Sequence, residues 1–296
     1  MRAACAKHMA LARVALACVS LSFLALTATA AVTPDPGGAG AWGAGLALLA
    51  DHEGPLSAFD QPARLAGKRE GPPATIATTA ATATSFDIGI AGSRARLFEL
   101  DALARSRLAL GVRAGAWGGA LGLESFGPPE ARRWRALCAL ALRRSSFDVG
   151  ASWNEWRSEG AGDRANRGGS LDLALVARGP RGFTGALALR ALAAGGHPIA
   201  RPDPDWTLEV AWRTRPVSAF LAVTRDLAGS RAGGGLALVA GPLSIRAGAV
   251  GAPWCGSLAI LFTGRVAGHA HANAGYARVS HPSLGLSEEW EGGIEW

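Results

Sequence analysis

The chain has 296 residues, of which 49% are hydrophobic, 18% are charged and 40 are glycine, and its formal net charge is +7. This composition excludes a disordered chain, which would be richer in charge and poorer in aliphatic residues. It also excludes a helical bundle, because each glycine costs a helix about 1 kcal/mol relative to alanine. The positive mean hydropathy of +0.17 leaves a membrane protein or an unusually apolar all-β protein.

The first thirty residues have the pattern of a cleaved export signal. Three basic residues, Arg2, Lys7 and Arg13, precede the uncharged apolar run Val14–Leu26, and small residues follow up to Ala30. The apolar run is shorter than the roughly 20 residues that a membrane-spanning helix needs. Residues 1–30 are therefore predicted to be a signal peptide.

Removal of this signal changes the charge and the cysteine content. Three basic residues and no acidic ones are lost, so the formal net charge falls from +7 to +4. The remaining basic residues are scattered rather than clustered, and no nucleic-acid partner is predicted. Cys138 and Cys255 remain. We interpret both as small apolar side chains, although the sequence alone leaves open whether they pair.

The rest of the chain shows hydrophobic alternation with a period of two. In Asp205–Arg213, for example, every second residue from Trp206 to Trp212 is apolar, and the intervening residues are polar, charged or small. The same alternation occurs in Ser146–Trp156, Ser170–Arg178 and Pro242–Val250. A period of two places each apolar set on one face of a β-strand.

Strand length and spacing predict a barrel. Most candidate strands have about 8 to 12 residues, enough to cross a bilayer when tilted. Short turns such as Gly179–Arg181, Thr214–Pro216 and Gly241–Pro242 alternate with longer polar connections such as Ser158–Gly169. We therefore expect an all-β, transmembrane, antiparallel up-and-down β-barrel over residues 84–296, with about fourteen strands, or twelve if the connections are longer.

Tryptophan placement supports membrane insertion. The chain has 10 Trp and a single Tyr, and aromatic residues form girdles at both interfaces of membrane barrels. The residues we place near strand ends are Trp134, Trp156, Trp206, Trp212, Trp290 and Trp296. The alternative is a secreted soluble β-sandwich, in which these side chains would belong to the core.

The last segment is predicted to be the strand that closes the barrel. Trp290, Ile294 and Trp296 fall on one face, and Glu289, Glu291 and Glu295 fall on the other. Closure is required because every backbone polar group inside lipid needs a partner. Outer-membrane barrels commonly end on such an aromatic residue, which the barrel-assembly machinery reads, so that machinery and outer-membrane lipid are the expected partners.

Two stretches carry a family resemblance. The first is the small-residue stretch Gly43–Asp51, followed by a motif made of Gln61, Pro62, Ala63, Leu65 and Ala66. The second is Tyr276–Ser287, which contains a His-Pro-Ser-Leu-Gly turn before the last strand. Together they resemble outer-membrane barrels of the long-chain fatty-acid transporter (FadL-like) superfamily, most closely its PorV/PorQ relatives.

The resemblance implies a 14-stranded barrel in the cell outer membrane, with residues 31–83 folded into the lumen as a hatch or plug. In the fatty-acid transporters the hatch gates the passage of apolar ligands. In the PorV-like proteins the barrel is an attachment partner for a secretion system. The chain is short for either, which leaves the barrel itself as the main expectation.

Several polar residues are predicted to face the lumen. The candidates are His269, His271, Asn273, Arg213, Glu209 and Arg246. His269 and His271 could form half of a metal site, but no Cys, Asp or Glu lies close in sequence to complete it. We therefore favour lumen polarity and predict no metal. Other inward charges, such as Asp148, Asp172 and Arg190, are expected to form cross-strand ion pairs.

The sequence does not predict an enzyme or a cofactor, since it lacks a Gly-x-Ser-x-Gly nucleophile elbow and a phosphate-binding glycine loop. The favoured hypothesis is an outer-membrane barrel that passes or binds a small hydrophobic ligand. The first alternative is a non-transporting barrel that anchors a secretion or assembly complex, and the second is the soluble β-sandwich.

Overall fold

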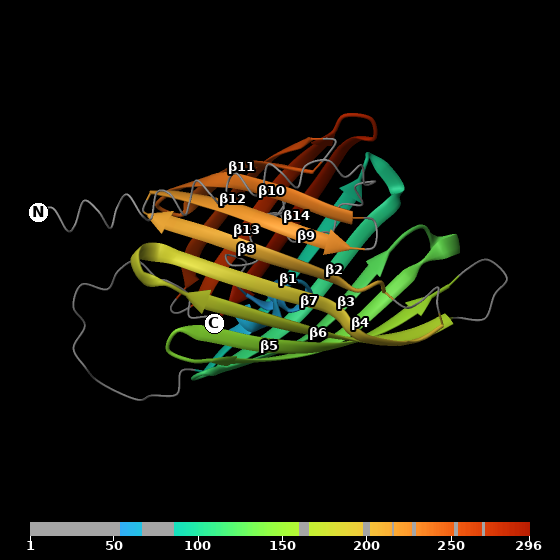
Figure 1. Ribbon diagram of the computed structural model, residues 1–296, viewed down its shortest axis with the longest axis horizontal. Coiled ribbons are helices and arrows are strands. Elements are labelled where there is room, and N and C mark those ends of the chain that lie inside the picture. Colours follow the sequence, from blue (N-terminus) through green and yellow to red (C-terminus); the bar gives the residue numbers. More distant parts are fainter. Residues whose placement is uncertain are drawn as a thin grey trace, which may run out of the picture.

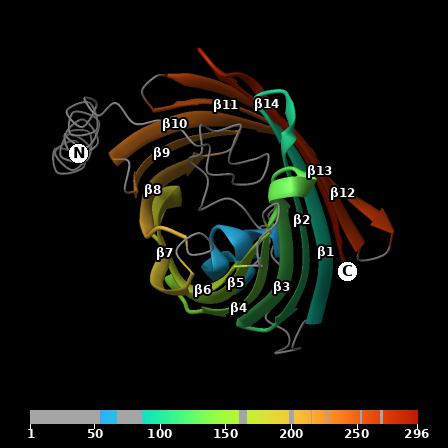
Figure 2. The same ribbon diagram turned by 90° about the vertical axis from the view of Figure 1, so that its right-hand side faces the viewer.

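A computed structural model of the chain describes residues 54–66, 86–159, 166–197, 202–214, 216–226, 229–251, 254–267 and 270–296. The predicted signal peptide and the Gly43–Asp51 stretch lie outside the described residues. Fourteen strands form a closed barrel (Figures 1 and 2). They are β1 Phe86–Leu97, β2 Leu100–Ala114, β3 Trp117–Phe126, β4 Arg133–Arg143, β5 Phe147–Ser158, β6 Asn166–Arg178, β7 Phe183–Gly196, β8 Asp205–Thr214, β9 Val217–Asp226, β10 Gly229–Ala240, β11 Leu243–Val250, β12 Cys255–Ala267, β13 Ala270–His281 and β14 Gly285–Glu295.

The topology is up-and-down, as the sequence predicts. Each strand pairs antiparallel with its neighbours in the chain, and β14 pairs with β1 to close the barrel. The prediction of fourteen antiparallel strands is confirmed. The connections differ in length. Turns such as 115–116 and 241–242 lie at the end of the barrel that carries Trp296, whereas β3, β5 and β7, each followed by six or more residues before the next strand, end at the opposite end of the barrel. We call these the short-turn end and the long-connection end.

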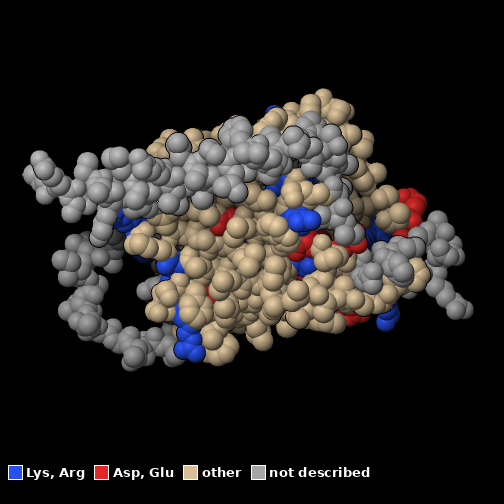
Figure 3. All heavy atoms as spheres, in the orientation of Figure 1, with Lys and Arg blue, Asp and Glu red and all other residues tan. Residues whose placement is uncertain are grey.

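The two faces of the wall differ as the alternation requires. On β8, Leu208, Val210 and Trp212 are exposed on the outside, whereas Glu209 and Ala211 are fully buried inside. Apolar side chains of almost all the remaining strands are exposed in the same way, and uncharged residues cover most of the described surface seen in Figure 3. Within the described ranges there is no helix long and apolar enough to cross a membrane.

Three details of the sequence interpretation are wrong. Trp156 does not belong to an outer girdle: it faces inward, where its Nε1 donates to Ser170 Oγ at 3.1 Å, because it shares the strand parity of the buried Asn154. Trp290 does face outward, but it lies at the middle of β14 rather than near an end. The predicted connection Ser158–Gly169 is also too long: β6 begins at Asn166, and Gly168 and Gly169 already pair through their backbones with both neighbouring strands.

Cys138 and Cys255 do not form a disulfide with each other. Cys138 is exposed on β4, and Cys255 is buried at the start of β12.

The interior is filled mainly by small side chains. One buried cluster joins alanines of β6 to β10 with Phe220 and Ala63, and a second joins Phe59 and Leu65 to alanines of β1 to β4. Ala63, Phe59 and Leu65 belong to the segment 54–66, which lies inside the barrel (Figure 2). The small residues of the wall thus leave the space that this segment occupies.

The exposed outer face generates a stability prediction. Leu121 is 59% exposed in the middle of β3, so Leu121→Arg should place a charge against the hydrocarbon of a bilayer. We expect a loss of about 2–4 kcal/mol in the free energy of unfolding, measured by denaturant titration in lipid vesicles. Leu284→Arg is the control, because Leu284 is the same residue type and is also exposed but lies in the β13–β14 turn. Equal losses for the two variants would contradict a lipid-facing β3.

Candidate functional site: a segment packed inside the barrel

Residues 54–66 form two short 3-10 helices, η1 Pro55–Phe59 and η2 Pro62–Ala66. A proline opens each helix, where its fixed φ favours the helical turn and its missing N–H costs nothing. Gly54 precedes η1 with a φ of 93°, a conformation that favours glycine. All residues from Gly54 to Ala66 are buried, and the two helices pack against β1 to β6.

The wall accommodates this segment with glycines. A Cβ atom on Gly150 of β5 would collide with the backbone of Pro62 and Ala63, and one on Gly118 of β3 would collide with the backbone of Leu65. A Cβ on Gly122 would lie 2.7 Å from Cζ of Phe59. Any side chain at these positions would displace the segment, because protein interiors are close-packed.

An ion-pair chain ties the segment to β2 and β3. The Arg107 guanidinium donates to Asp60 of the segment, with Nη1 2.9 Å from Oδ2, and through Nε to Glu124 at 2.5 Å. All three side chains are nearly or completely buried. Asp60 is therefore the charged group by which the segment engages the wall, and charge-assisted bonds of this kind are stronger than neutral ones.

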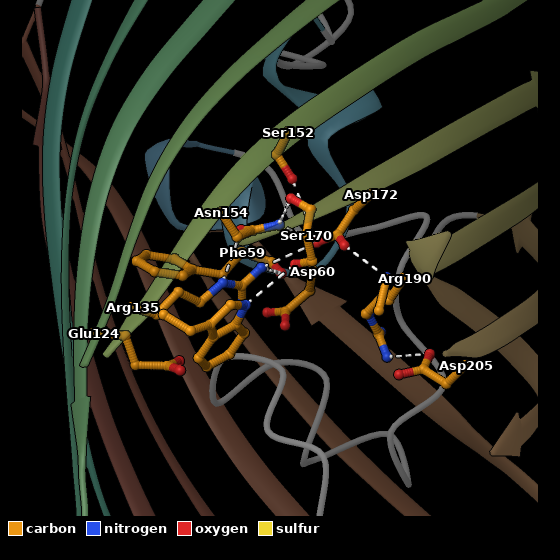
Figure 4. A network of polar contacts seen from close by, with 12 residues as sticks. Phe59, Asp60, Glu124, Arg135, Ser152, Asn154, Ser170, Asp172, Arg190 and Asp205 are labelled. Atoms are coloured by element: carbon orange, nitrogen blue, oxygen red, sulfur yellow. Dashed lines mark hydrogen bonds and ion pairs between the residues drawn. The ribbon is translucent and has the colours of Figure 1, made fainter. Parts of the chain in front are cut away.

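A second arginine holds the segment from β4 (Figure 4). Arg135 Nη2 donates to the backbone carbonyl of Phe59 at 3.1 Å and to Asp172 Oδ2 at 3.1 Å, while its Nε donates to Asn154 Oδ1 at 2.9 Å. Asn154 Nδ2 donates in turn to Asp172 Oδ2 at 2.9 Å. The buried guanidinium is thus oriented by β5 and β6 before it contacts the segment.

Aromatic rings lie between the arginines. The Arg107 and Arg135 guanidinium carbons lie 4.9 and 5.5 Å from the centre of the Phe59 ring. On the other side of Arg135, the Trp156 ring lies 5.0 Å from its guanidinium carbon and 4.4 Å from that of Arg133. Such cation–π contacts contribute about 0.5–2 kcal/mol each, so Phe59 adds an apolar and electrostatic anchor next to Asp60.

The hatch-motif residues lie at the end of this segment. Pro62, Ala63, Leu65 and Ala66 form η2 and are buried against the wall. Gln61 joins the two helices and is fully buried. Neither Nε2 nor Oε1 of Gln61 has a hydrogen-bond partner in the described part of the chain. A buried unsatisfied amide costs about 1–3 kcal/mol, so the packed position of the segment carries an internal penalty.

The predicted lumen residues are distributed over three strands. Glu209 is fully buried on the inner face of β8, and Arg213 follows on the same face. Arg246 lies on the inner face of β11, where its Nε is 3.3 Å from Ser244 Oγ. His271 and Asn273 lie inward on β13, opposite Glu295 and Gly293 of β14.

His269 lies outside the described residues. No group of three metal-ligating side chains occurs among the residues that the structure describes. The structure does not bring the predicted lumen residues to one point; Arg213 and Glu209 share β8, His271 and Asn273 share β13, and Arg246 lies apart.

The residues that hold the segment were not singled out from the sequence. Asp60 and Phe59 are neighbours of the motif, but nothing in the sequence connects them to Arg107 or Arg135. The sequence did contain one signal, the parity of each strand, which is the alternation of its inward and outward positions. It places Arg105, Arg107 and Arg135 on the inner face of their strands, and inward arginines of a barrel need carboxylate partners.

Comparisons with known proteins agree on the fold. No protein-family model matches the sequence, and no curated protein matches it. Among solved structures, the Pseudomonas putida toluene transporter TodX has a TM-score of 0.59 at 10% identity, covering 90% of this chain and 99% of that one. A Pseudomonas aeruginosa FadL homologue has a TM-score of 0.53 at 10% identity, with 91% and 99% covered. The chain therefore has the FadL-type barrel fold.

The glycine contacts give a test of the packing. Gly150→Ala should push η2 away from β5 at a cost of about 1–3 kcal/mol, the usual penalty of overpacking. Limited trypsin digestion should then cut faster after Arg64, which is only 3% exposed, while the barrel strands stay resistant. Gly256→Ala is the control, since a Cβ there meets nothing within 4 Å. Equal cleavage in both variants would contradict the close approach.

Proposed function

We propose that this protein is an outer-membrane channel that passes small apolar molecules, with residues 54–66 acting as the gate. One observation carries the proposal: a closed barrel holds a separate segment against its inner wall through the Asp60–Arg107 pair and the Arg135–Phe59 contact. The FadL-type fold supports it, because TodX, which has a barrel of this type, is a toluene transporter. Closeness to PorV/PorQ proteins stays a prediction from the motifs.

The nature of the contacts suits a gate. The segment joins the wall through side chains and the carbonyls of Phe59 and Leu65 rather than through strand pairing, so it can leave without breaking the barrel. The alanine-rich inner face of β6 to β10 would then present an apolar path, with Phe220 as its large side chain. The Gln61 amide, which has no hydrogen-bond partner among the described residues, would gain hydrogen bonds to water on release, and this gain lowers the cost of opening.

Membrane placement is tested first, because gating depends on it. The protein should stay in the membrane fraction after carbonate washing and should be released only by detergent. A closed barrel should also run faster on an unheated gel than after boiling. Release by salt or carbonate alone would instead favour a soluble β protein.

Gating is tested by variants with opposite expected effects. Asp60→Ala removes the carboxylate that pairs with Arg107, and we expect uptake of a labelled apolar solute such as toluene to rise about tenfold, equivalent to about 1.4 kcal/mol. Gln61→Leu removes the unsatisfied amide and should lower uptake. Asp205→Ala is the matched control, because Asp205 forms an ion pair with Arg190 at 2.9 Å that does not involve the segment.

The outcomes separate the candidate functions. Unchanged uptake in both segment variants, with the heat-dependent gel shift intact, would reject the gate. If a stoichiometric protein also co-purified and uptake stayed unchanged when residues 54–66 were deleted, a non-transporting barrel that anchors a complex would replace the channel.

A further inference from the structure

The outer wall of the barrel carries its charges at one end only. On the described strands, register places eight charged side chains on the outside: Arg94, Arg96, Glu155, Arg157, Arg167, Arg225, Arg278 and Glu288. Asp101, at the irregular start of β2, is also exposed and lies near Arg96. Each lies within the part of its strand nearest the long-connection end. Towards the short-turn end, the outward positions of these strands are uncharged.

Three of the arginines form one patch on adjacent strands. Strand pairing places Arg94 and Arg96 of β1 beside β14, and Arg278 of β13 on the other side of β14. Between them, Glu288 accepts from Arg96 Nη2 at 3.4 Å and lies 3.5 Å from Arg278 Nε. We call Arg94, Arg96 and Arg278 the arginine patch.

The patch has excess positive charge that is open to the outside. The Arg96 and Arg278 side chains are 45% and 50% exposed, and one carboxylate, Glu288, serves both. Asp101 adds only a distant contact, 3.9 Å from Arg96, and is itself 92% exposed. Arg94 is exposed and has no ion-pair partner within the described ranges.

Aromatic rings border the patch on its side towards the middle of the wall. Trp290 lies opposite both Arg94 and Tyr276 in the strand register, and the Trp290 and Tyr276 rings are 4.2 Å apart. The Tyr276 hydroxyl donates to Glu288 at 2.8 Å. On β1, β13 and β14, no outward side chain nearer the short-turn end than Trp290 is charged. Although Trp290 lies at the middle of β14, this change from apolar to charged positions is the one expected where hydrocarbon meets headgroups, a level at which aromatic rings with a polar edge are typical. The arginines are therefore placed at headgroup height.

The arginine patch suits a partner of opposite charge at that height. An arginine against hydrocarbon is costly, but the cost falls to about 0–1 kcal/mol near the interface. Guanidinium groups bind phosphate oxygens through paired, charge-assisted hydrogen bonds. We propose that the arginine patch binds the phosphate of an anionic lipid headgroup in the leaflet at the long-connection end. This inference rests on the membrane placement proposed above, but not on the gate.

The patch is tested on the purified full-length protein in detergent, with phosphatidylglycerol as the probe and phosphatidylcholine as the zwitterionic comparison. Native mass spectrometry counts the retained lipids. Arg94→Gln/Arg278→Gln should weaken retention of phosphatidylglycerol by about fivefold for each arginine removed, with little change for phosphatidylcholine. Glu288→Gln should strengthen it, because the competing carboxylate is lost.

The control removes two exposed arginines from turns at the opposite end, Arg144→Gln/Arg181→Gln. It should leave the retention of phosphatidylglycerol unchanged. Equal loss in the control and the patch variant would overturn the proposal in favour of unspecific charge attraction. A patch variant that keeps its lipid but changes oligomeric state on size-exclusion chromatography would also overturn it, in favour of contact between copies. Each sample is first checked for the heat-dependent gel shift, so failure of membrane placement is seen separately.

Discussion

The pairing of the first strand with the last is the constraint on which the other features of this molecule depend. Residues 89–96 of β1 pair with residues 288–295 of β14, so no strand edge is left open. In lipid an open edge would leave unpaired backbone groups at several kcal/mol each. The same pairing fixes which side chains face inward, because a slip of one residue would turn every side chain of a strand to the other face.

The register is reinforced by buried charge. Arg105 on β2 and Glu289 on β14 lie 3.1 Å apart across β1, and both are almost completely buried. A buried ion pair is weak evidence for stability, since desolvation offsets much of its attraction, but removal of one partner alone is strongly destabilising. The pair therefore acts chiefly by selecting the register, because a shift of β14 would move Glu289 away from the buried Arg105.

The alternation of inward and outward side chains along each strand explains how much of this architecture could be predicted from the sequence. Alternation in segments such as Asp205–Arg213 is a local property, and it predicts the strands, their inner and outer faces and, with their length, the number of strands. The Trp156 error arose from reading its position along the strand without its parity, which places it beside the buried Asn154. The same rule would have placed Arg107 and Arg135 inside.

Strand parity does not identify which residue a buried charged side chain will contact. Asp60 and Arg107 are separated by 47 positions in the chain, and their contact depends on where η1 comes to lie against the closed barrel. Likewise, Ala191 adopts a φ of 50° in β7 where the β6–β7 register shifts, and Asp172 Oδ1 accepts its backbone N–H at 2.8 Å. Neither a turn residue nor a glycine in the sequence marks this bulge. Tertiary contact alone determines it.

The last strand carries one carboxylate of the buried ion pair and one carboxylate of the outer arginine patch. Glu288 and Glu289 are consecutive, so they point to opposite faces of β14: Glu288 contacts Arg96 and Arg278 on the outside, and Glu289 pairs with Arg105 on the inside. The pairing of β14 with β1 and β13 therefore aligns the buried pair and the outer patch at the same height. A one-residue slip of β14 would put Glu289 outside and Glu288 inside, which would preserve a carboxylate on each face but shift both relative to their arginines. The apolar neighbours oppose this slip, because it would also turn Trp290 and Ile294 into the glycine- and alanine-lined interior, where their bulk has no space.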